Sequence, residues 1–237
     1  MQTLENKVAY ITGGSKGIGF GIAKKLSDAG MRVAITSRHI NEAKKAAQSL
    51  SNDESRIIAL ESDVTSLESE TQAIKKVVEQ FGALDVLVAN AGIGHFASIE
   101  DLTPEIWKQT IDTNLTGVFN SVKASLQEIK KSKGYIITIG SLAGINFFEN
   151  GSAYNASKFG IVGFSQAIML DLRKHDIKVT TIMPGSVATN FNDHEVSEKD
   201  AWKIQPEDIG EMVVNLLNMH PRTLPSKIEV RPLKPVK

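Results

Sequence analysis

Short apolar runs recur along the chain and alternate with longer segments that have helical spacing. The runs lie at residues 8–11, 32–36, 56–60, 84–89, 135–139 and 178–182, with a last candidate at 227–230. A strand that is apolar along its whole length is typical of a parallel sheet with both faces covered. The alternation of strands and helices therefore predicts an α/β fold, with a parallel sheet between two layers of helices.

The segments between these runs are predicted as helices. They lie at about 17–29, 41–50, 65–81, 107–120, 126–131, 154–173 and 206–218. Asn114 falls in the middle of one of them, where an amide competes with the backbone hydrogen bonds. Its plain interpretation is a surface position with local bonding. The polar stretch 186–205 is predicted as a mobile loop with a short helix.

Charge and composition restrict the class of protein. The 237 residues carry no net charge, because 27 basic residues balance 27 acidic ones. Binding of nucleic acid needs a basic surface, so no nucleic-acid partner is expected. The chain has no cysteine, which excludes disulfides and thiolate metal sites, and no metal is expected. The first residues lack a signal pattern and no apolar run could span a membrane, so we expect a cytoplasmic protein without a membrane partner.

A glycine-rich turn follows the first apolar run. Gly13, Gly17 and Gly19 stand between the predicted strand and the predicted helix. Glycines allow a tight turn and a close approach, and the free N–H groups of a helix N-terminus attract a phosphate. The spacing differs from the common dinucleotide fingerprint, and no Gly-Lys-Ser/Thr follows as in a P-loop. The turn is therefore a candidate anion site, with a simple turn as the alternative.

The end of the second predicted strand carries information on a cofactor. In a dinucleotide fold, an acid at this place binds the 2′-hydroxyl of NAD, whereas an arginine suits the 2′-phosphate of NADP. Here Ser37 stands where the acid is expected, Arg38 follows, and Lys16 lies in the glycine turn on the same side. Two cations and no carboxylate favour NADP(H) over NAD(H). The alternative is that both cations are solvated surface charges.

One stretch contains two candidate catalytic residues. Tyr154 and Lys158 stand four residues apart in a predicted helix, so their side chains share one face. An ammonium beside a phenol favours the phenolate, so we expect Lys158 to lower the pKa of Tyr154. Such a pair could transfer a proton near neutral pH. The spacing alone is a weak signal, because both residues are common on helix surfaces.

The set of motifs resembles the classical short-chain dehydrogenase/reductases over nearly the whole chain. The matching residues, in order, are Thr12, Gly13, Gly17, Gly19, Asp63, Val64, Asn90, Ala91, Gly92, Asn114, Ser141, Tyr154, Lys158, Pro184, Gly185 and Thr189. The resemblance implies a single Rossmann-like domain over residues 1–237, with a doubly wound sheet of about seven strands. It also implies hydride transfer between a nicotinamide and a carbonyl or a secondary alcohol. Within the family, the chain is similar to 3-oxoacyl-carrier-protein reductases.

The resemblance also implies roles for individual residues. Ser141 would hold the substrate oxygen and Tyr154 would give it a proton, while Lys158 would tune Tyr154 and bind the nicotinamide ribose. Asn114 would hold a water that links Lys158 to solvent. The implied cofactor contacts are Gly13, Ser15, Gly17 and Ile18 at the diphosphate, Lys16, Ser37 and Arg38 at the ribose, Asp63, Val64, Asn90, Ala91 and Gly92 towards the adenosine and centre, and Pro184, Gly185, Val187 and Thr189 at the nicotinamide. Asp63 could instead cap the following helix.

The expected substrate is a small molecule. Five aromatic residues follow strands four to six: Phe96, Phe147, Phe148, Phe191 and Trp202. A pocket lined by them would suit an apolar ketone or a 3-oxoacyl group, although each could simply pack a loop onto the core. The alternatives are an NAD(H)-dependent alcohol or sugar dehydrogenase and a catalytically silent dinucleotide-binding regulator. The last predicted strand lacks the glycine pair of many tetrameric relatives, so a homodimer through helices 107–131 and 154–173 competes with a homotetramer.

Overall fold

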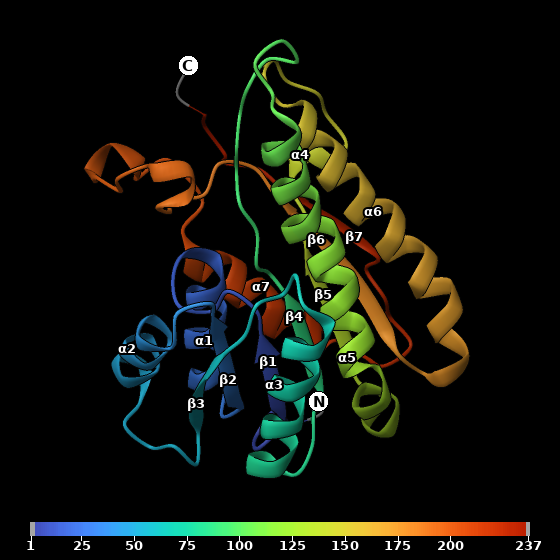
Figure 1. Cartoon of the computed structure of the whole chain (residues 1–237). Helices are drawn as coiled ribbons and strands as arrows, with labels where there is room; N and C mark the ends of the chain where they lie inside the picture. The colour runs from blue at the N-terminus through green and yellow to red at the C-terminus, as the bar shows by residue number, and fades with distance from the viewer. Residues whose placement is uncertain (1–2, 236–237) are drawn as a thin grey trace.

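The computed structural model describes residues 3–235, and its centre is a sheet of seven parallel strands (Figure 1). The strands are β1 (Val8–Ile11), β2 (Arg32–Ser37), β3 (Ile57–Glu61), β4 (Val86–Ala89), β5 (Tyr135–Ile139), β6 (Lys178–Pro184) and β7 (Lys227–Val230). Their order in the sheet is β3-β2-β1-β4-β5-β6-β7. The order reverses direction between β1 and β4, which is where open α/β sheets bind ligands, beyond the carboxyl ends of the strands.

Helices cover both faces of the sheet, as the apolar strands require. One face carries α1 (Gly17–Asp28), α2 (Ile40–Leu50) and α7 (Pro206–Asn218), and the other carries α3 (Leu67–Phe81), α5 (Gly117–Ser132) and α6 (Ser152–Leu172). Alternate residues of β1 enter opposite cores: Ala9 and Ile11 pack with α1, whereas Val8 and Tyr10 pack with α3. The predicted fold class, a Rossmann-like doubly wound sheet, is confirmed.

The prediction of a regular helix over 107–120 was wrong in one important respect. Helix α4 (Pro104–Ile111) runs into α5 through a π-helical segment, Asp112–Thr116, so the two helices form one continuous column (Figure 1). A π-segment inserts an extra residue into a helical turn and is frequent at functional sites. Asn114 lies inside this segment and is fully buried, which rules out the surface interpretation.

Among residues 3–235, no helix combines the length and the hydropathy that crossing a membrane would require.

Candidate active site

Hydrogen bonds join the glycine turn to the residues that follow β4. The side-chain amide of Asn90 donates to the carbonyl oxygens of Thr12 (2.9 Å) and Gly13 (3.1 Å). In return, the hydroxyl oxygen of Thr12 accepts from the backbone N–H groups of Asn90 (3.0 Å) and Ala91 (3.1 Å). Gly13 and Gly17 have φ angles of +63° and +56°, in the left-handed region that favours glycine. These contacts fix the turn at the point where the strand order reverses.

The shape of this turn fits a diphosphate. Lys16 caps α1 without any side-chain hydrogen bond to the first turn, so the N-terminal N–H groups of the helix have no side-chain cap. A Cβ atom added at Gly19 would lie 2.5 Å from the Asn90 amide nitrogen, and one at Gly17 would lie 3.3 Å from Thr189. The N-terminus of α1 therefore lies beside Thr189, and the helix dipole favours an anion there.

The end of β2, where the cofactor ribose is expected, contains a carboxylate that the sequence analysis missed. The hydroxyl of Ser37 donates to Glu42 at 3.1 Å, because α2 begins three residues after the strand and turns Glu42 back towards it. Glu42 and Lys16 also line one cavity of about 400 Å³ between α1 and α2, together with Lys45. Lys16 and Arg38 are exposed, and their role at the cofactor stays a prediction. The expectation of two cations without a carboxylate is thus corrected: a carboxylate lies beside them.

Asp63 and Val64 occupy the loop between β3 and α3. The Asp63 carboxylate accepts from the N–H (2.9 Å) and the hydroxyl (2.8 Å) of Thr65. The cap of α3 is Ser66, not Asp63, and the helix starts at Leu67 instead of Thr65. The capping role suggested for Asp63 is therefore wrong, while its role towards the adenosine stays a prediction. Val64 is buried and fixes the loop by accepting a bond from the Asn120 side chain (2.8 Å) through its carbonyl oxygen.

Asn114 ties the π-segment to the loop after β4. Its side-chain oxygen accepts from the N–H of Ile93 (2.8 Å), and its amide group donates to the carbonyl of Ile93 (3.0 Å) and to the hydroxyl of Ser157 (3.1 Å). A Cβ atom at Gly92 would lie 3.3 Å from the Asn114 oxygen and 3.8 Å from Lys158 Nζ. Asn114, Gly92 and Lys158 therefore meet at one point.

Tyr154, Lys158 and Ser141 come together at the carboxyl end of β5. Ser141 starts a short 3₁₀ turn after the strand, and its hydroxyl accepts from the N–H of Ala143 at 3.1 Å. Lys158 is buried, lies 5.6 Å from the centre of the Tyr154 ring and donates to the carbonyl of Ile139 at 3.2 Å. The Ser141 hydroxyl is near enough to Tyr154 to act on its pKa. The structure thus brings these predicted catalytic residues together.

The electrostatics differ from the expectation. Burial raises the pKa of Tyr154 above its usual value of 10.0, and the Ser141 hydroxyl lowers it only in part. Burial also lowers the pKa of Lys158 to about 8. Desolvation disfavours the charged form of each group, and it is the first cause of both shifts. The net shift of the Tyr154 pKa is thus upward, opposite to the expected direction, while the effect of Lys158 on it stays a prediction.

Two residues of α6 that sequence reasoning missed hold these groups in place. The Ser157 hydroxyl donates to the Tyr154 carbonyl at 2.8 Å and accepts from Asn114. The Asn155 amide donates to the carbonyls of Ala143 and Asn146, both at 2.7 Å, and so ties the Ser141 turn to the helix. Both side chains are buried. Two polar residues between the tyrosine and the lysine of an apolar helix were the available signal.

The predicted nicotinamide end lies in the segment after β6. Pro184 closes the strand, and the N–H of Gly185 donates to Val230 at 2.8 Å. A Cβ atom at Gly185 would lie 3.1 Å from Leu142, next to Ser141. Val187 forms a bridge with Ile204 across the base of the loop. Residues 184–189 thus run between the Ser141 turn and the glycine turn, which Thr189 contacts.

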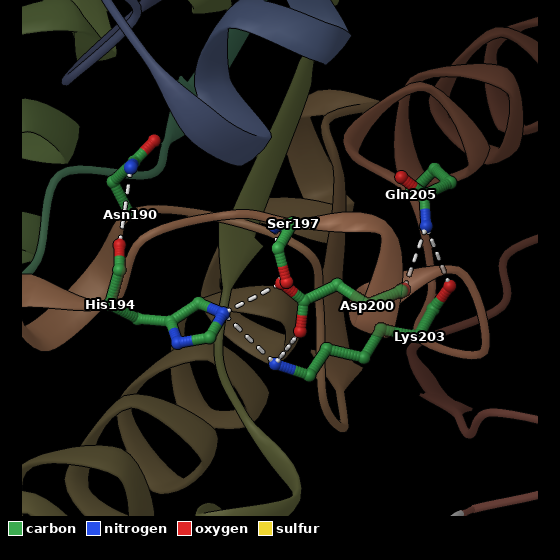
Figure 2. A network of polar contacts seen from close by, with 6 residues as sticks. All are labelled: Asn190, His194, Ser197, Asp200, Lys203 and Gln205. Atoms are coloured by element: carbon green, nitrogen blue, oxygen red, sulfur yellow. Dashed lines mark hydrogen bonds and ion pairs between the residues drawn. The ribbon is translucent and has the colours of Figure 1, made fainter.

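Residues 190–205 form a loop closed by an ionic cluster (Figure 2). Asp200 is buried and accepts from Ser197 N–H (2.9 Å), while His194 Nε2 lies 2.8 Å and Lys203 Nζ 2.5 Å from its carboxylate. These contacts, with Lys203 first, hold the pKa of Asp200 below its usual range. The side chain of Gln205 donates to the carbonyls of Asp200 (3.3 Å) and Lys203 (3.0 Å). The polar stretch contains two 3₁₀ turns instead of one short helix.

The five predicted pocket aromatics divide into two groups. Phe96, Phe148 and Phe191 surround Tyr154, with ring centres between 5.4 and 6.3 Å from its own. Phe147 instead stacks on Phe159 at 5.2 Å and is 84% exposed. The ring of Trp202 lies under the ammonium of Lys203 in the loop. Only the first group borders the predicted catalytic residues.

A model of the short chain dehydrogenase family matches residues 7–200. The chain belongs to this family. It is 39% identical over 189 residues to trans-4-hydroxycyclohexanecarboxylate dehydrogenase of Sinomonas cyclohexanicum, covering 77% of this chain and 73% of that protein. From its family and its relatives, the protein is a dinucleotide-dependent oxidoreductase that acts on CH–OH groups.

Two solved structures of the family share the fold. An alcohol dehydrogenase from Thermococcus sibiricus complexed with 5-hydroxy-NADP superposes with a TM-score of 0.91 and 30% identity, covering 98% of this chain and 100% of that one. A 3-ketoacyl-(acyl-carrier-protein) reductase from Brucella melitensis complexed with NADH gives a TM-score of 0.88 and 25% identity, covering 97% and 98%. Both likenesses extend over nearly the whole chain.

Proposed function

We propose that the protein is an NADP(H)-dependent reductase of an apolar ketone or 3-oxoacyl group, with Asn114, Ser141, Tyr154 and Lys158 as its catalytic residues. The observation that supports this most is the meeting of a protonated phenol, a hydroxyl and a buried ammonium at the carboxyl end of β5. A nicotinamide bound beside them would supply the hydride.

Each residue then has a chemical task. The Ser141 hydroxyl donates to the substrate oxygen and holds it next to Tyr154. The raised pKa of Tyr154 keeps the phenol protonated, so it can give a proton to that oxygen and no free alkoxide forms. Lys158, with a pKa of about 8, is mostly charged near neutral pH and favours the phenolate left behind. Asn114 holds the loop after β4 against the lysine.

The preference for NADP(H) rests on Lys16 and Arg38, which are exposed beside the end of β2. Both could pair with a 2′-phosphate, whereas Glu42 would repel it. Among similar proteins, one binds 5-hydroxy-NADP and another binds NADH, so both cofactors occur in the family. An NAD(H)-dependent alcohol or sugar dehydrogenase is the second candidate, favoured by the carboxylate of Glu42 on Ser37.

The test is turnover with both cofactors. Oxidation of NADPH and of NADH is followed by absorbance on a panel of apolar and hydroxylated ketones. We expect activity with NADPH and a lower kcat/KM with NADH. The variant Arg38→Asp should reverse this preference, because the new charge repels the 2′-phosphate. Binding of NADPH without turnover on any ketone would instead support a silent regulator, and better use of NADH would support the second candidate.

We also propose a homodimer through the helices on the α5–α6 side. Large apolar side chains are exposed there, although such residues are usually covered. They are Trp107 on α4, Phe119 on α5, and Phe159 and Leu170 on α6. Light scattering at micromolar concentration tests this: a clean monomer would reject it, and a tetramer would support the competing assembly.

A further inference from the structure

Three phenylalanine rings from three separate loops meet at Tyr154. Phe96 follows β4, Phe148 follows β5 and Phe191 follows β6, so all three extend from the carboxyl edge of the sheet. The ring centres of Phe96 and Phe191 lie 5.4 and 5.9 Å from that of Tyr154, and the ring of Phe148 lies at 6.3 Å. The loops thus converge on the residue predicted to give the proton.

Each ring is held against a fixed neighbour. Phe148 lies against Gly151, where an added Cβ atom would be 2.7 Å from the ring. Phe191 crosses from the β6 loop to Gly94 in the β4 loop, and a side chain at Gly94 would collide with it. Phe96 packs edge-on against Phe148, with centres 5.4 Å apart. The three rings therefore form a wall around Tyr154, in which Phe96 packs on Phe148 and Phe191 packs on Tyr154 itself.

This wall presents apolar surface where a substrate must bind. Phe96 and Phe148 are each 43% exposed and Phe191 is 38% exposed, although each ring packs on Tyr154. Aromatic surface left open beside reactive polar groups marks a binding site. A ketone whose oxygen reaches Ser141 and Tyr154 must place the carbons next to its carbonyl near these rings.

We infer that the site selects compact ketones with apolar flanks, and that Phe96, Phe148 and Phe191 determine this specificity. The inference rests on the proposed function and narrows its substrate class. A sugar-like ketone would bury hydroxyls against the rings without hydrogen-bond partners. A linear acyl chain would lose more conformational freedom on binding than a rigid ring.

The test compares two neighbouring phenylalanines. In Phe148→Ala one ring of the wall is removed, whereas Phe147→Ala removes a ring that stacks on Phe159 away from Tyr154. The probes are 4-methylcyclohexanone, the N-acetylcysteamine thioester of 3-oxobutanoate, and dihydroxyacetone, each with NADPH. We expect the cyclic ketone to be the best substrate of the wild type. Its kcat/KM should fall about tenfold or more in Phe148→Ala and stay unchanged in Phe147→Ala.

The outcomes separate this inference from the proposed function. Turnover that favours the thioester or dihydroxyacetone, or equal losses in the two variants, would overturn the inference and leave the reductase proposal standing. An absence of turnover with every ketone, while NADPH still binds, would overturn both. If Phe148→Ala fails to fold, as thermal unfolding would show, Phe191→Ala takes its place with the same expected loss. A second readout is saturation-transfer NMR with 4-methylcyclohexanol, whose signal should weaken in Phe148→Ala and persist in Phe147→Ala.

Discussion

The catalytic residues and the loop at 190–205 lie at the same edge of the sheet but are held by different interactions. Asn114 is buried in the π-segment and Lys158 is buried on α6, and they bond to the backbone carbonyls of Ile93 after β4 and Ile139 in β5. The loop consists of short turns, and a buried carboxylate, Asp200, collects its contacts from within the loop itself (Figure 2). One region is fixed by the core, and the other is fixed by a local charge cluster.

The two regions are suited to different tasks, the chemical step and the binding of substrate. Groups that transfer a proton must be held within a fraction of an ångström, which packing in a core achieves. A loop that carries part of a substrate wall must admit and release the substrate, and elements with few core contacts open more easily. We therefore expect changes in the first region to affect the chemical step and changes in the loop to affect binding of the ketone.

The largest effect is expected for Tyr154→Phe. It removes the proton donor and leaves the ring, so the contacts with Phe96 and Phe191 persist. We expect kcat to fall about a thousandfold, within the usual range for loss of a general acid. Binding of NADPH, measured by fluorescence titration, should be unchanged. Turnover at the wild-type rate would refute the role of Tyr154.

The next largest effect concerns Lys158, whose buried charge destabilises the fold. Its pKa falls from 10.5 to about 8, so Lys158→Met should stabilise the protein by up to about 3 kcal/mol at pH 7 while it lowers turnover less than Tyr154→Phe does. Between these two values the folded state binds fewer protons than the unfolded state, so the stability of the wild type rises with pH. The difference in the free energy of unfolding between variant and wild type, measured by urea unfolding, should therefore narrow from pH 7 to pH 10. A difference that stays constant with pH would contradict the burial of a charged lysine.

A smaller effect is expected for Asp200→Asn in the loop. Loss of the charge removes the ion pairs with His194 and Lys203, so the KM for the ketone should rise about tenfold while kcat and NADPH affinity stay the same. Asp28→Asn is the matched control, because its pair with Lys24 is exposed. A fall in kcat with an unchanged KM would mean that the loop acts on chemistry instead.

The stabilising contribution of Asp200 in the same cluster should persist as the pH is lowered. The carboxyl of Asp200 has a lowered pKa in the folded state, so its contribution to stability is present above the usual aspartate value of about 3.9. It is lost only as the pH falls through the lower folded value. The wild-type KM should consequently show no rise from this group between neutral pH and about pH 5.

The smallest effect is expected for Glu42→Gln at the end of β2. Removing the carboxylate beside Ser37 leaves Lys16 and Arg38 without a nearby acid, so the ratio of kcat/KM for NADPH over NADH should rise about threefold to tenfold. Glu54→Gln, at an exposed position, serves as the control. An unchanged ratio would show that Glu42 does not influence the cofactor preference.

The sequence predicted the regular elements well because their signals are local. Apolar runs gave the seven strands, and Pro206 with the acids after it marked the start of α7. The π-segment around Asn114 could not be predicted, since one inserted residue leaves no mark on the apolar spacing. The Glu42–Ser37 contact and the Asp200 cluster depend on how turns fold back, which spacing does not encode.

The candidate site shows the same limit. The motif residues were found in the sequence, but the balance between burial and charge at Tyr154 follows from how deeply α6 is packed. Four-residue spacing placed Lys158 beside Tyr154 correctly, but it could not show the upward net shift of the Tyr154 pKa, because desolvation is a property of the fold. Likewise, nothing in the order of the aromatics separated Phe147 from Phe148.

The most direct test of the whole account is a crystal structure of the protein with NADP⁺ and the alcohol of its best ketone. The account predicts that the hydroxyls of Ser141 and Tyr154 both lie within hydrogen-bond distance of the same alcohol oxygen, with the substrate carbons against Phe96, Phe148 and Phe191. An alcohol oxygen bound out of reach of either hydroxyl would contradict it.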